Sequence, residues 1–363
     1  MASKSILITG GAGFIGSNFV RYLLAVNPDV EIINLDALTY AGSLLNLKNL
    51  PGSDRHEFIE GNILDRELIL DLLKKYKIQT VIHFAAETHV DRSILGPDNF
   101  ISTNITGTFQ VLEAARQAWL ESSSQAGGPF RFHHISTDEV YGSLTPDQEA
   151  FSESNPYQPN SPYAASKAAS DHLVRSYHHT YGLPVTITNC SNNYGPYQYP
   201  EKLIPLVILN ALAHKPIPIY GDGKQIRDWL YVEDHCEAIV QILDKGKPGE
   251  TYNIGGDNQP TNVEIVEMIC RILDEKLPDP AAGSRSSLIQ YVSDRPGHDR
   301  RYAINNTKIQ RSLGWAPKYS LEEGLNKTVN WYLENPKWIE EIQNKQSLQD
   351  WNRKNYLERE EKS

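Results

Sequence analysis

The first half of the chain alternates short apolar runs with longer segments of helical periodicity. Alternation of this kind is typical of βαβ units, in which helices cover both faces of a parallel sheet. The apolar runs are nearly continuous, as strands buried on both sides require. The predicted strands are Ser5–Thr9, Glu31–Asp36, Thr80–Ala85, Arg131–Ser136 and Pro184–Cys190. The predicted helices are Phe14–Val26, Leu64–Lys77, Pro97–Leu120 and Tyr163–Tyr181.

The regularity weakens after Asn193, where stretches rich in Tyr, Pro and Gly separate two predicted helices, Leu203–Ala213 and Val263–Leu273. Ser122–Pro129 and Lys276–Ser287 predict surface loops. We therefore expect an α/β fold with a Rossmann-type doubly wound parallel sheet and a smaller C-terminal α/β lobe. The predicted divisions are residues 1–190, residues 191–345, with the chain recrossing between the two lobes, and a C-terminal tail at 346–363.

Composition narrows the class of protein. A net charge of −10 over 363 residues argues against a nucleic-acid binder. No run reaches the 18 or more apolar residues that a membrane-spanning helix needs, and a strand predicted almost at the N-terminus leaves no room for a signal peptide. Three cysteines without paired or metal-like spacing fit a reducing compartment, so we expect a cytoplasmic protein without a metal site.

A glycine turn follows the first predicted strand and opens the first predicted helix. Gly10, Gly13 and Gly16 have the spacing of a dinucleotide-binding turn, in which backbone N–H groups at the helix N-terminus bind a pyrophosphate. Asp36 closes the second strand about 20 residues later, where a carboxylate accepts hydrogen bonds from a ribose diol. Because Ala37 and not an arginine follows, the sequence predicts NAD rather than NADP.

Tyr163 and Lys167 lie one helical turn apart and point the same way. An ammonium beside a phenol favours the phenolate, so we expect the pKa of Tyr163 to fall toward neutrality. Such a tyrosine takes the proton of a hydroxyl while hydride leaves the same carbon. The pattern predicts a sugar or alcohol dehydrogenase step.

Asp138 and Glu139 come directly after the strand Arg131–Ser136. Neighbours on a strand point to opposite faces, so both acids can serve one ligand only where the strand has ended. Ligands of open α/β sheets bind beyond the carboxyl ends of the strands. Two acids beside a Tyr–Lys pair indicate that water is eliminated as well as hydride transferred.

Eight motifs run in order along the chain: TGGAGFIG, HFAAETHVDRSI, STDEVYG, SPYAASKAASDHLVRSY, TNCSNNYGPYQYPEKLIP, YGDGKQIRDWLYVEDHC, YNIGG and DRPGHDRRYAI. With these motifs the chain resembles the extended short-chain dehydrogenase/reductase superfamily and, within it, the dTDP-glucose 4,6-dehydratase family. The resemblance covers roughly residues 5–335. The glycine turn and Tyr-x-x-x-Lys are shared with sugar-nucleotide epimerases, which typically have small or hydroxyl residues in place of the two acids.

The resemblance implies a role for each catalytic candidate. Tyr163 takes the proton of the 4-hydroxyl as hydride passes to NAD, and Lys167 holds the nicotinamide ribose. Glu139 removes the carbon-5 proton, Asp138 protonates the departing 6-hydroxyl, and Thr137 binds the 4-oxygen. Hydride then returns to carbon 6, and carbon 5 is reprotonated. The product would be dTDP-4-keto-6-deoxyglucose.

The resemblance also implies ligand contacts in both parts of the chain, with NAD in residues 1–190 and the nucleotide sugar mainly in residues 191–345. One departure is Asn62, where the family usually has Asp. The implied NAD contacts are Gly10, Gly13, Phe14, Ile15, Gly16, Asp36, Ala37, Leu38, Thr39, Asn62, Ile63, Phe84, Ala85, Ala86, Thr103, Tyr163, Lys167 and Asn193. The implied nucleotide-sugar contacts are Thr88, Thr137, Asn192, Lys202, Leu203, Pro218, Ile219, Tyr220, Arg227, Asn262, Arg295, His298 and Tyr356.

Three alternatives stay open at this point. The chain is a sugar-nucleotide 4-epimerase, a dehydratase of a UDP-, GDP- or CDP-sugar, or a non-catalytic NAD-sensing scaffold protein. The helices at 97–120 and 163–181 carry apolar and aromatic residues suited to the homodimer interface of the family, although both could equally cover their own sheet. His83, His133 and His134 lie in predicted strands and are expected to be packed core residues.

Overall fold

A seven-stranded, wholly parallel sheet forms the centre of the fold, in the order β10-β6-β5-β4-β1-β2-β3. The computed structural model describes residues 5–121 and 130–353. The strand order reverses between β1 and β4, the point at which doubly wound sheets bind ligands. The strands are β1 (Ser5–Thr9), β2 (Glu31–Asp36), β3 (His56–Glu60), β4 (Thr80–His83), β5 (Arg131–Thr137), β6 (Val185–Cys190) and β10 (Thr251–Ile254).

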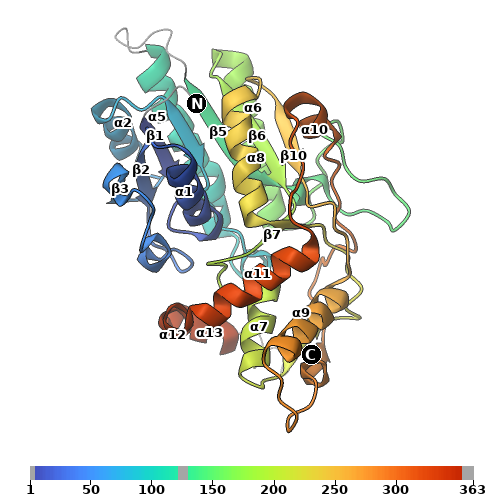
Figure 1. Ribbon diagram of the computed structural model, residues 1–363. Coiled ribbons are helices and arrows are strands. Elements are labelled where there is room, and N and C mark those ends of the chain that lie inside the picture. The colour runs from blue at the N-terminus through green and yellow to red at the C-terminus, as the bar shows by residue number, and fades with distance from the viewer. Residues whose placement is uncertain (1–4, 122–129, 354–363) are drawn as a thin grey trace.

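Helices cover both faces of this sheet (Figure 1). Alternate residues of β1 point to opposite faces, so Ile6 and Ile8 join one core and Leu7 joins the other. The helices are α1 (Phe14–Val26) and α8 (Val232–Lys245) on the first face, and α2 (Arg66–Lys75), α5 (Thr108–Arg116) and α6 (Pro162–Tyr181) on the second. This arrangement confirms the predicted Rossmann-type class.

The helix predicted at 97–120 is one helical stretch with two wider, π-type turns. It consists of α4 (Asp98–Phe100), η3 (Ile101–Gly107), α5 and η4 (Gln117–Glu121). Within η3, the Asn104 side chain donates to Ser166 Oγ on α6 at 2.8 Å and accepts from the Glu87 amide at 2.8 Å. π turns are frequent at functional sites, and this one attaches α6 to the loop after β4.

The second lobe lies below the carboxyl ends of the large sheet (Figure 1). Its core joins α7, α9 and α11 with short strands and the C-terminal helices. The chain recrosses through α8 and β10, which return to the large sheet. The elements of the chain not yet given, some of them beside the large sheet, are α3 (Val90–Leu95), β7 (Asn192–Tyr194), α7 (Leu203–Leu212), β8 (Ile217–Tyr220), β9 (Trp229–Tyr231), α9 (Asn262–Lys276), β11 (Ile289–Val292), α10 (Thr307–Leu313), α11 (Leu321–Glu334), α12 (Pro336–Gln343) and α13 (Gln346–Asn352), with 3-10 turns η1 (Leu44–Leu47), η2 (Ser53–Arg55), η5 (Asp138–Tyr141) and η6 (Arg285–Leu288).

Several strands were not predicted, and the loop expected at Ser122–Pro129 lies outside the described residues. β3 reads HEFIE and forms the sheet edge, where charged and half-buried residues hide the apolar pattern. β7, β8, β9, β10 and β11 are only three or four residues long. Within the described residues, no helix combines the length and apolar character that a membrane crossing requires.

Candidate active site

The glycine turn brings the backbone of β1 against the loop after β4. Gly10 has a φ of +75°, and a Cβ atom there would lie 2.6 Å from the Ala85 amide nitrogen. Gly13 is the N-cap of α1 and provides no side-chain cap. The first N–H groups of α1 are therefore available to an anion, which the positive end of the helix dipole also favours.

Asp36 lies at the end of β2 and holds the neighbouring loops. Its carboxylate accepts hydrogen bonds from the Ala12 amide at 2.9 Å and from the Leu38 amide at 2.8 Å. Burial raises the pKa of Asp36, and these two hydrogen bonds oppose the rise. The carboxylate is thereby fixed at the rim of the glycine turn, where a ribose diol would meet it.

One cavity of about 360 Å³ runs along the carboxyl ends of the strands. Ligand sites commonly enclose about 300–1,000 Å³. Every implied NAD contact lines this cavity except Leu38, whose amide donates a hydrogen bond to the Asp36 carboxylate. The lining NAD candidates are Gly10, Gly13, Phe14, Ile15, Gly16, Asp36, Ala37, Thr39, Asn62, Ile63, Phe84, Ala85, Ala86, Thr103, Tyr163, Lys167 and Asn193.

The helix α6 carries Tyr163 and Lys167 into the same cavity. Ser161 caps its N-terminus by accepting from the Ala164 amide at 3.1 Å, and Pro162 occupies the first turn. Lys167 Nζ donates to the Ile135 carbonyl at 2.8 Å and lies 3.3 Å from His134 Nε2. Both site residues are buried, so their charges interact in a medium of low dielectric constant.

The expected fall in the pKa of Tyr163 is wrong for this structure. Burial raises the pKa of Tyr163 well above its usual value, Glu139 and Cys190 add to the rise, and a hydrogen bond with Thr137 opposes it. Burial lowers the pKa of Lys167 to about 8. The hydrogen bonds of Lys167 go to β5 instead of the phenol, which explains why its charge does not offset the burial of Tyr163.

The two adjacent acids enter the cavity because β5 has ended. Thr137 is its last residue, and Thr137 Oγ1 accepts from the Glu139 amide at 3.3 Å to start a 3-10 turn. Asp138 and Glu139 both line the cavity. The expected convergence of Thr137, Asp138, Glu139, Tyr163 and Lys167 is therefore observed.

The two carboxyls have different surroundings. Burial raises the pKa of Asp138 well above its usual value, and the neighbouring carboxylates of Glu139 and Asp228 raise it further. Asp138 Oδ2 has no hydrogen-bond partner among the described residues. Burial also raises the pKa of Glu139, but the cations Arg295, Arg227 and Lys202 oppose that rise. Two carboxyls whose environments push their pKa values apart suit an acid and a base.

Two arginines, the buried Arg227 and the partly buried Arg295, oppose the rise that burial causes in the pKa of Glu139. Arg227 donates to the Ile226 carbonyl at 2.8 Å and the Asp299 carbonyl at 3.0 Å, and its guanidinium lies 4.4 Å from the Tyr302 ring centroid. Arg295 forms a 2.8 Å ion pair with Asp91 on α3. The protein thus places fixed cations near Glu139, where they could attract an anionic ligand.

The implied nucleotide-sugar contacts fall into two groups. Tyr356 lies outside the described residues. Those lining the cavity are Thr88, Thr137, Asn192, Lys202 and Leu203. Those not lining it are Pro218, Ile219, Tyr220, Arg227, Asn262, Arg295 and His298. Two residues that do not line the cavity meet at Asp91, which forms an ion pair with Arg295 and accepts from the Tyr220 hydroxyl at 3.2 Å. A third, His298, lies edge to face with the Tyr220 ring, with 6.3 Å between the ring centroids.

Two carboxylates of the cavity were missed. Glu87 and Glu201 line it, and Glu201 forms a 2.9 Å ion pair with Arg92 on α3. Both lie inside quoted motifs, beside residues that were predicted as contacts, so the sequence held a signal for them. The expected core histidines His83, His133 and His134 are buried. Among the described residues, no cluster of His, Cys, Asp or Glu could hold a metal ion.

Comparison with known proteins adds independent information. The family described as GDP-mannose 4,6 dehydratase matches residues 7–328. The chain is similar to the dTDP-glucose 4,6-dehydratase of Xanthomonas campestris pv. campestris (strain B100), with 56% identity over 93% of this chain and 95% of that protein. The chain belongs to the dTDP-glucose 4,6-dehydratase family.

Solved structures of the dTDP-glucose 4,6-dehydratase family agree with this membership. The chain is similar to the enzyme of Streptomyces venezuelae solved with NAD bound, with a TM-score of 0.84 and 48% identity over 93% of this chain and 99% of that one. It is also similar to the enzyme of Bacillus anthracis in complex with NAD, with a TM-score of 0.82 and 46% identity over 93% and 99%. The family predicted from the motifs is therefore confirmed.

Proposed function

We propose that this protein is an NAD-dependent hydro-lyase that converts dTDP-glucose into dTDP-4-keto-6-deoxyglucose. The observation that carries the proposal is that Asp138 and Glu139 share one buried cavity with Tyr163, Lys167 and the glycine turn. An epimerase needs no acid beyond the tyrosine, whereas elimination needs both a proton donor and a proton acceptor. The relatives at 46–56% identity bear the same dehydratase name.

The cavity fits NAD on the protein side. The uncapped N-terminus of α1 faces the pyrophosphate position, and Asp36 takes the ribose hydroxyls. Ala37 after Asp36 offers no cation for a 2′-phosphate. When bound, NAD supplies a hydride acceptor for carbon 4 of the sugar and a hydride donor for carbon 6.

The side chains move the protons of the reaction. Tyr163 accepts the proton of the 4-hydroxyl as a phenolate, a form that burial disfavours and that the positive charge of bound NAD would favour, and Thr137 positions the 4-oxygen. Glu139, where burial raises the pKa and the nearby cations oppose the rise, removes the carbon-5 proton that the 4-ketone has acidified. Asp138 carries the proton that the departing 6-hydroxyl needs, because burial and two neighbouring carboxylates favour its neutral form. Each carboxyl is thus given the role that its surroundings favour.

The nucleotide diphosphate binds at the cationic end of the site. Arg227 and Arg295 are fixed by other groups of the protein before substrate arrives, so little ordering is lost on binding. Incubation of purified protein with dTDP-, UDP-, GDP- and CDP-glucose tests the assignment. A keto product from dTDP-glucose is expected; a 4-epimer, or turnover of another nucleotide sugar alone, would contradict it.

We propose further that the enzyme is a cytoplasmic homodimer that pairs through the stretch 98–121 and α6. Ile101 and Leu120 are 50% and 39% exposed, and Tyr181 at the end of α6 is 48% exposed. The cysteines Cys190, Cys236 and Cys270 are free and buried, which suits a reducing compartment. Light scattering coupled to gel filtration tests the dimer, and a monomer mass would contradict it.

A further inference from the structure

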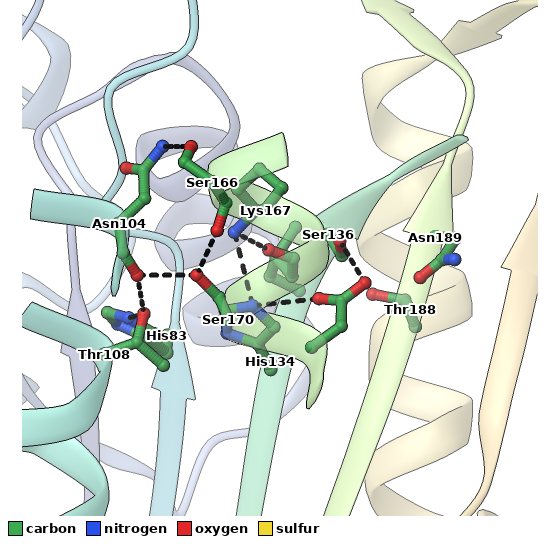
Figure 2. A network of polar contacts seen from close by, with 12 residues as sticks. His83, Asn104, Thr108, His134, Ser136, Ser166, Lys167, Ser170, Thr188 and Asn189 are labelled. Atoms are coloured by element: carbon green, nitrogen blue, oxygen red, sulfur yellow. Dashed lines mark hydrogen bonds and ion pairs between the residues drawn. The ribbon is translucent and has the colours of Figure 1, made fainter. Parts of the chain in front are cut away.

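A buried ionisable pair, His134 and Asp171, lies beside Lys167 and does not line the cavity. His134 Nε2 on β5 lies 3.3 Å from Lys167 Nζ and also 3.3 Å from Asp171 Oδ1, one turn further along α6. Figure 2 shows His134 directly beside Lys167. All three side chains are at most 4% exposed. None of the proton transfers of the proposed dehydration uses His134 or Asp171.

A single imidazole nitrogen faces two partners in this arrangement. Nε2 carries either a hydrogen or a lone pair, so it accepts from the Lys167 ammonium or donates to Asp171, but not both. Among the described residues, His134 Nδ1 has no hydrogen-bond partner, and Asp171 Oδ1 has none beyond its 3.3 Å contact with His134 Nε2. The other carboxylate oxygen of Asp171 is held by Ser136 Oγ at 2.8 Å and the Tyr157 hydroxyl at 3.0 Å. Oδ1 is thus kept facing His134.

We propose that Asp171, together with His134, is a positioning residue that keeps Lys167 charged and directed at the cavity near neutral pH. This inference deepens the proposed function and rests on it, because Lys167 lines the cavity and is the residue expected to hold the nicotinamide ribose. Asp171 does not line the cavity and touches no reacting atom. It acts through Lys167.

The surroundings of the cluster single out Asp171 as its source of negative charge. Burial raises the pKa of the Cys190 thiol to about 12 and lowers the pKa of His83 well below its usual value, so both are neutral at pH 7. Burial also raises the pKa of Tyr157 far above neutrality. The groups that face the cluster are His83 on β4, His134 on β5, Cys190 on β6, Tyr163 and His172 on α6, Tyr141 of η5 and Tyr157 of the loop before α6.

The directions of the pKa shifts agree with this geometry. Burial lowers the pKa of Lys167 to about 8, and Asp171 is the strongest opposing influence. Burial raises the pKa of Asp171 to about 6, and Lys167 is the strongest opposing influence there. Asp171 is therefore ionised above about pH 6 and Lys167 below about pH 8. Between these values both are charged.

The substitution Asp171→Asn tests the inference while conserving shape. The amide oxygen still accepts from Ser136 and Tyr157, whereas the amide NH₂ faces His134 Nε2 and competes with Lys167 for its lone pair. Asp234→Asn is the matched control. Asp234 lies on α8, away from the site, and is an equally buried carboxylate that accepts hydrogen bonds from the amides of Lys318 and Tyr319.

NAD released into an ultrafiltrate is measured on the holoenzyme between pH 5.5 and 9.5. In the unsubstituted protein, NAD retention should fall as pH rises through about 8, where Lys167 loses its proton. In Asp171→Asn this midpoint should move down by about one pH unit or more, because an ammonium without its opposite charge loses its proton more readily. Asp234→Asn should keep the original midpoint even if it melts at a lower temperature.

An unmoved midpoint in folded Asp171→Asn, or an equal loss of NAD at every pH, would overturn the inference and leave the dehydratase assignment standing. Should Asp171→Asn fail to fold, His134→Leu removes Nε2 and is expected to shift the midpoint in the same direction. NAD retention by the unsubstituted protein that stays flat from pH 7 to 9.5 would also overturn it. Failure of the proposed function looks different, since NAD would be retained with normal pH dependence but no keto product would form.

Discussion

The cofactor end and the substrate end of the site are built in contrasting ways. The cofactor end uses successive strand ends of one sheet, and its glycines and Asp36 follow strands that pair in register. The substrate end is joined by contacts between distant parts of the chain. Arg295 and Tyr220 both reach Asp91, across 204 and 129 residues. One end follows from local sequence, and the other depends on the closure of the second lobe onto α3.

This contrast predicts different consequences of substitution. At the strand ends, changes should act on cofactor binding or chemistry while the fold is retained. At the lobe junction, changes should act on substrate affinity. In the second lobe away from the junction, they should act on stability alone.

The largest effect is expected from Asp138→Asn, which removes the general acid while keeping the shape of a neutral side chain. Oxidation at carbon 4 should continue, but elimination should slow by about 10²–10⁴-fold, so that NADH absorbance accumulates in stopped-flow traces. Because burial raises the folded-state pKa of Asp138 well above its usual value, its acid form persists to a higher pH than that of an exposed aspartate and is lost as pH rises through the folded-state pKa. A folded variant with undiminished dehydratase turnover would remove Asp138 from the chemistry.

Asp36→Ala should weaken NAD binding by about ten- to one-hundred-fold, since hydrogen bonds to a charged group contribute about 1.5–3 kcal/mol. The substitution also frees the amides of Ala12 and Leu38, which loosens the glycine turn. Calorimetric titration of the cofactor-depleted protein measures this loss. Unchanged NAD affinity, or a preference for NADP in the unsubstituted enzyme, would show that the strand end is not the ribose site.

Arg227→Ala should raise KM for dTDP-glucose about ten-fold, on the same scale of charge-assisted hydrogen bonds. Arg300→Ala is its control, because Arg300 is an exposed arginine whose ion pair with Asp222 lies at the surface. Steady-state kinetics of the two folded variants make the comparison. Equal KM values for the Arg227→Ala and Arg300→Ala variants would show that Arg227 has a purely structural role.

The smallest effect is expected from Ser320→Ala in the second lobe. Ser320 accepts from the Glu323 amide, and Glu323 bonds back to the Ser320 amide, so the pair forms a capping box at the start of α11. Losing it should lower the free energy of unfolding by about 1 kcal/mol without changing KM or NAD retention. Urea unfolding measures the first quantity; a change in KM would show that α11 is coupled to the site.

The sequence predicted the cofactor end well because its signals are local. A glycine turn between a strand and a helix, and an acid at the next strand end, are all read within about 30 residues of chain. The acids after β5 could be placed for the same reason. The direction of the pKa shift of Tyr163 could not be predicted, because it depends on the orientation of the Lys167 ammonium. That orientation is set by hydrogen bonds to residues of β5.

The second lobe was harder to predict. Its strands are three or four residues long, and β8 contains Pro218, so no alternating pattern develops. Its site residues are brought together by ion pairs such as Arg295–Asp91, which leave no trace in sequence spacing. The network of Lys167, His134 and Asp171 was overlooked because a histidine in a strand resembles an ordinary core residue.

Elimination of water by Asp138 and Glu139 distinguishes this enzyme from an epimerase, and the fate of a label at carbon 4 reveals it. dTDP-glucose deuterated at carbon 4 is converted by the enzyme in ordinary water, and the product is examined by NMR and mass spectrometry. A dehydratase should give deuterium in the new methyl group at carbon 6 and a solvent proton at carbon 5. Deuterium returned to carbon 4 of an epimerised sugar would contradict it.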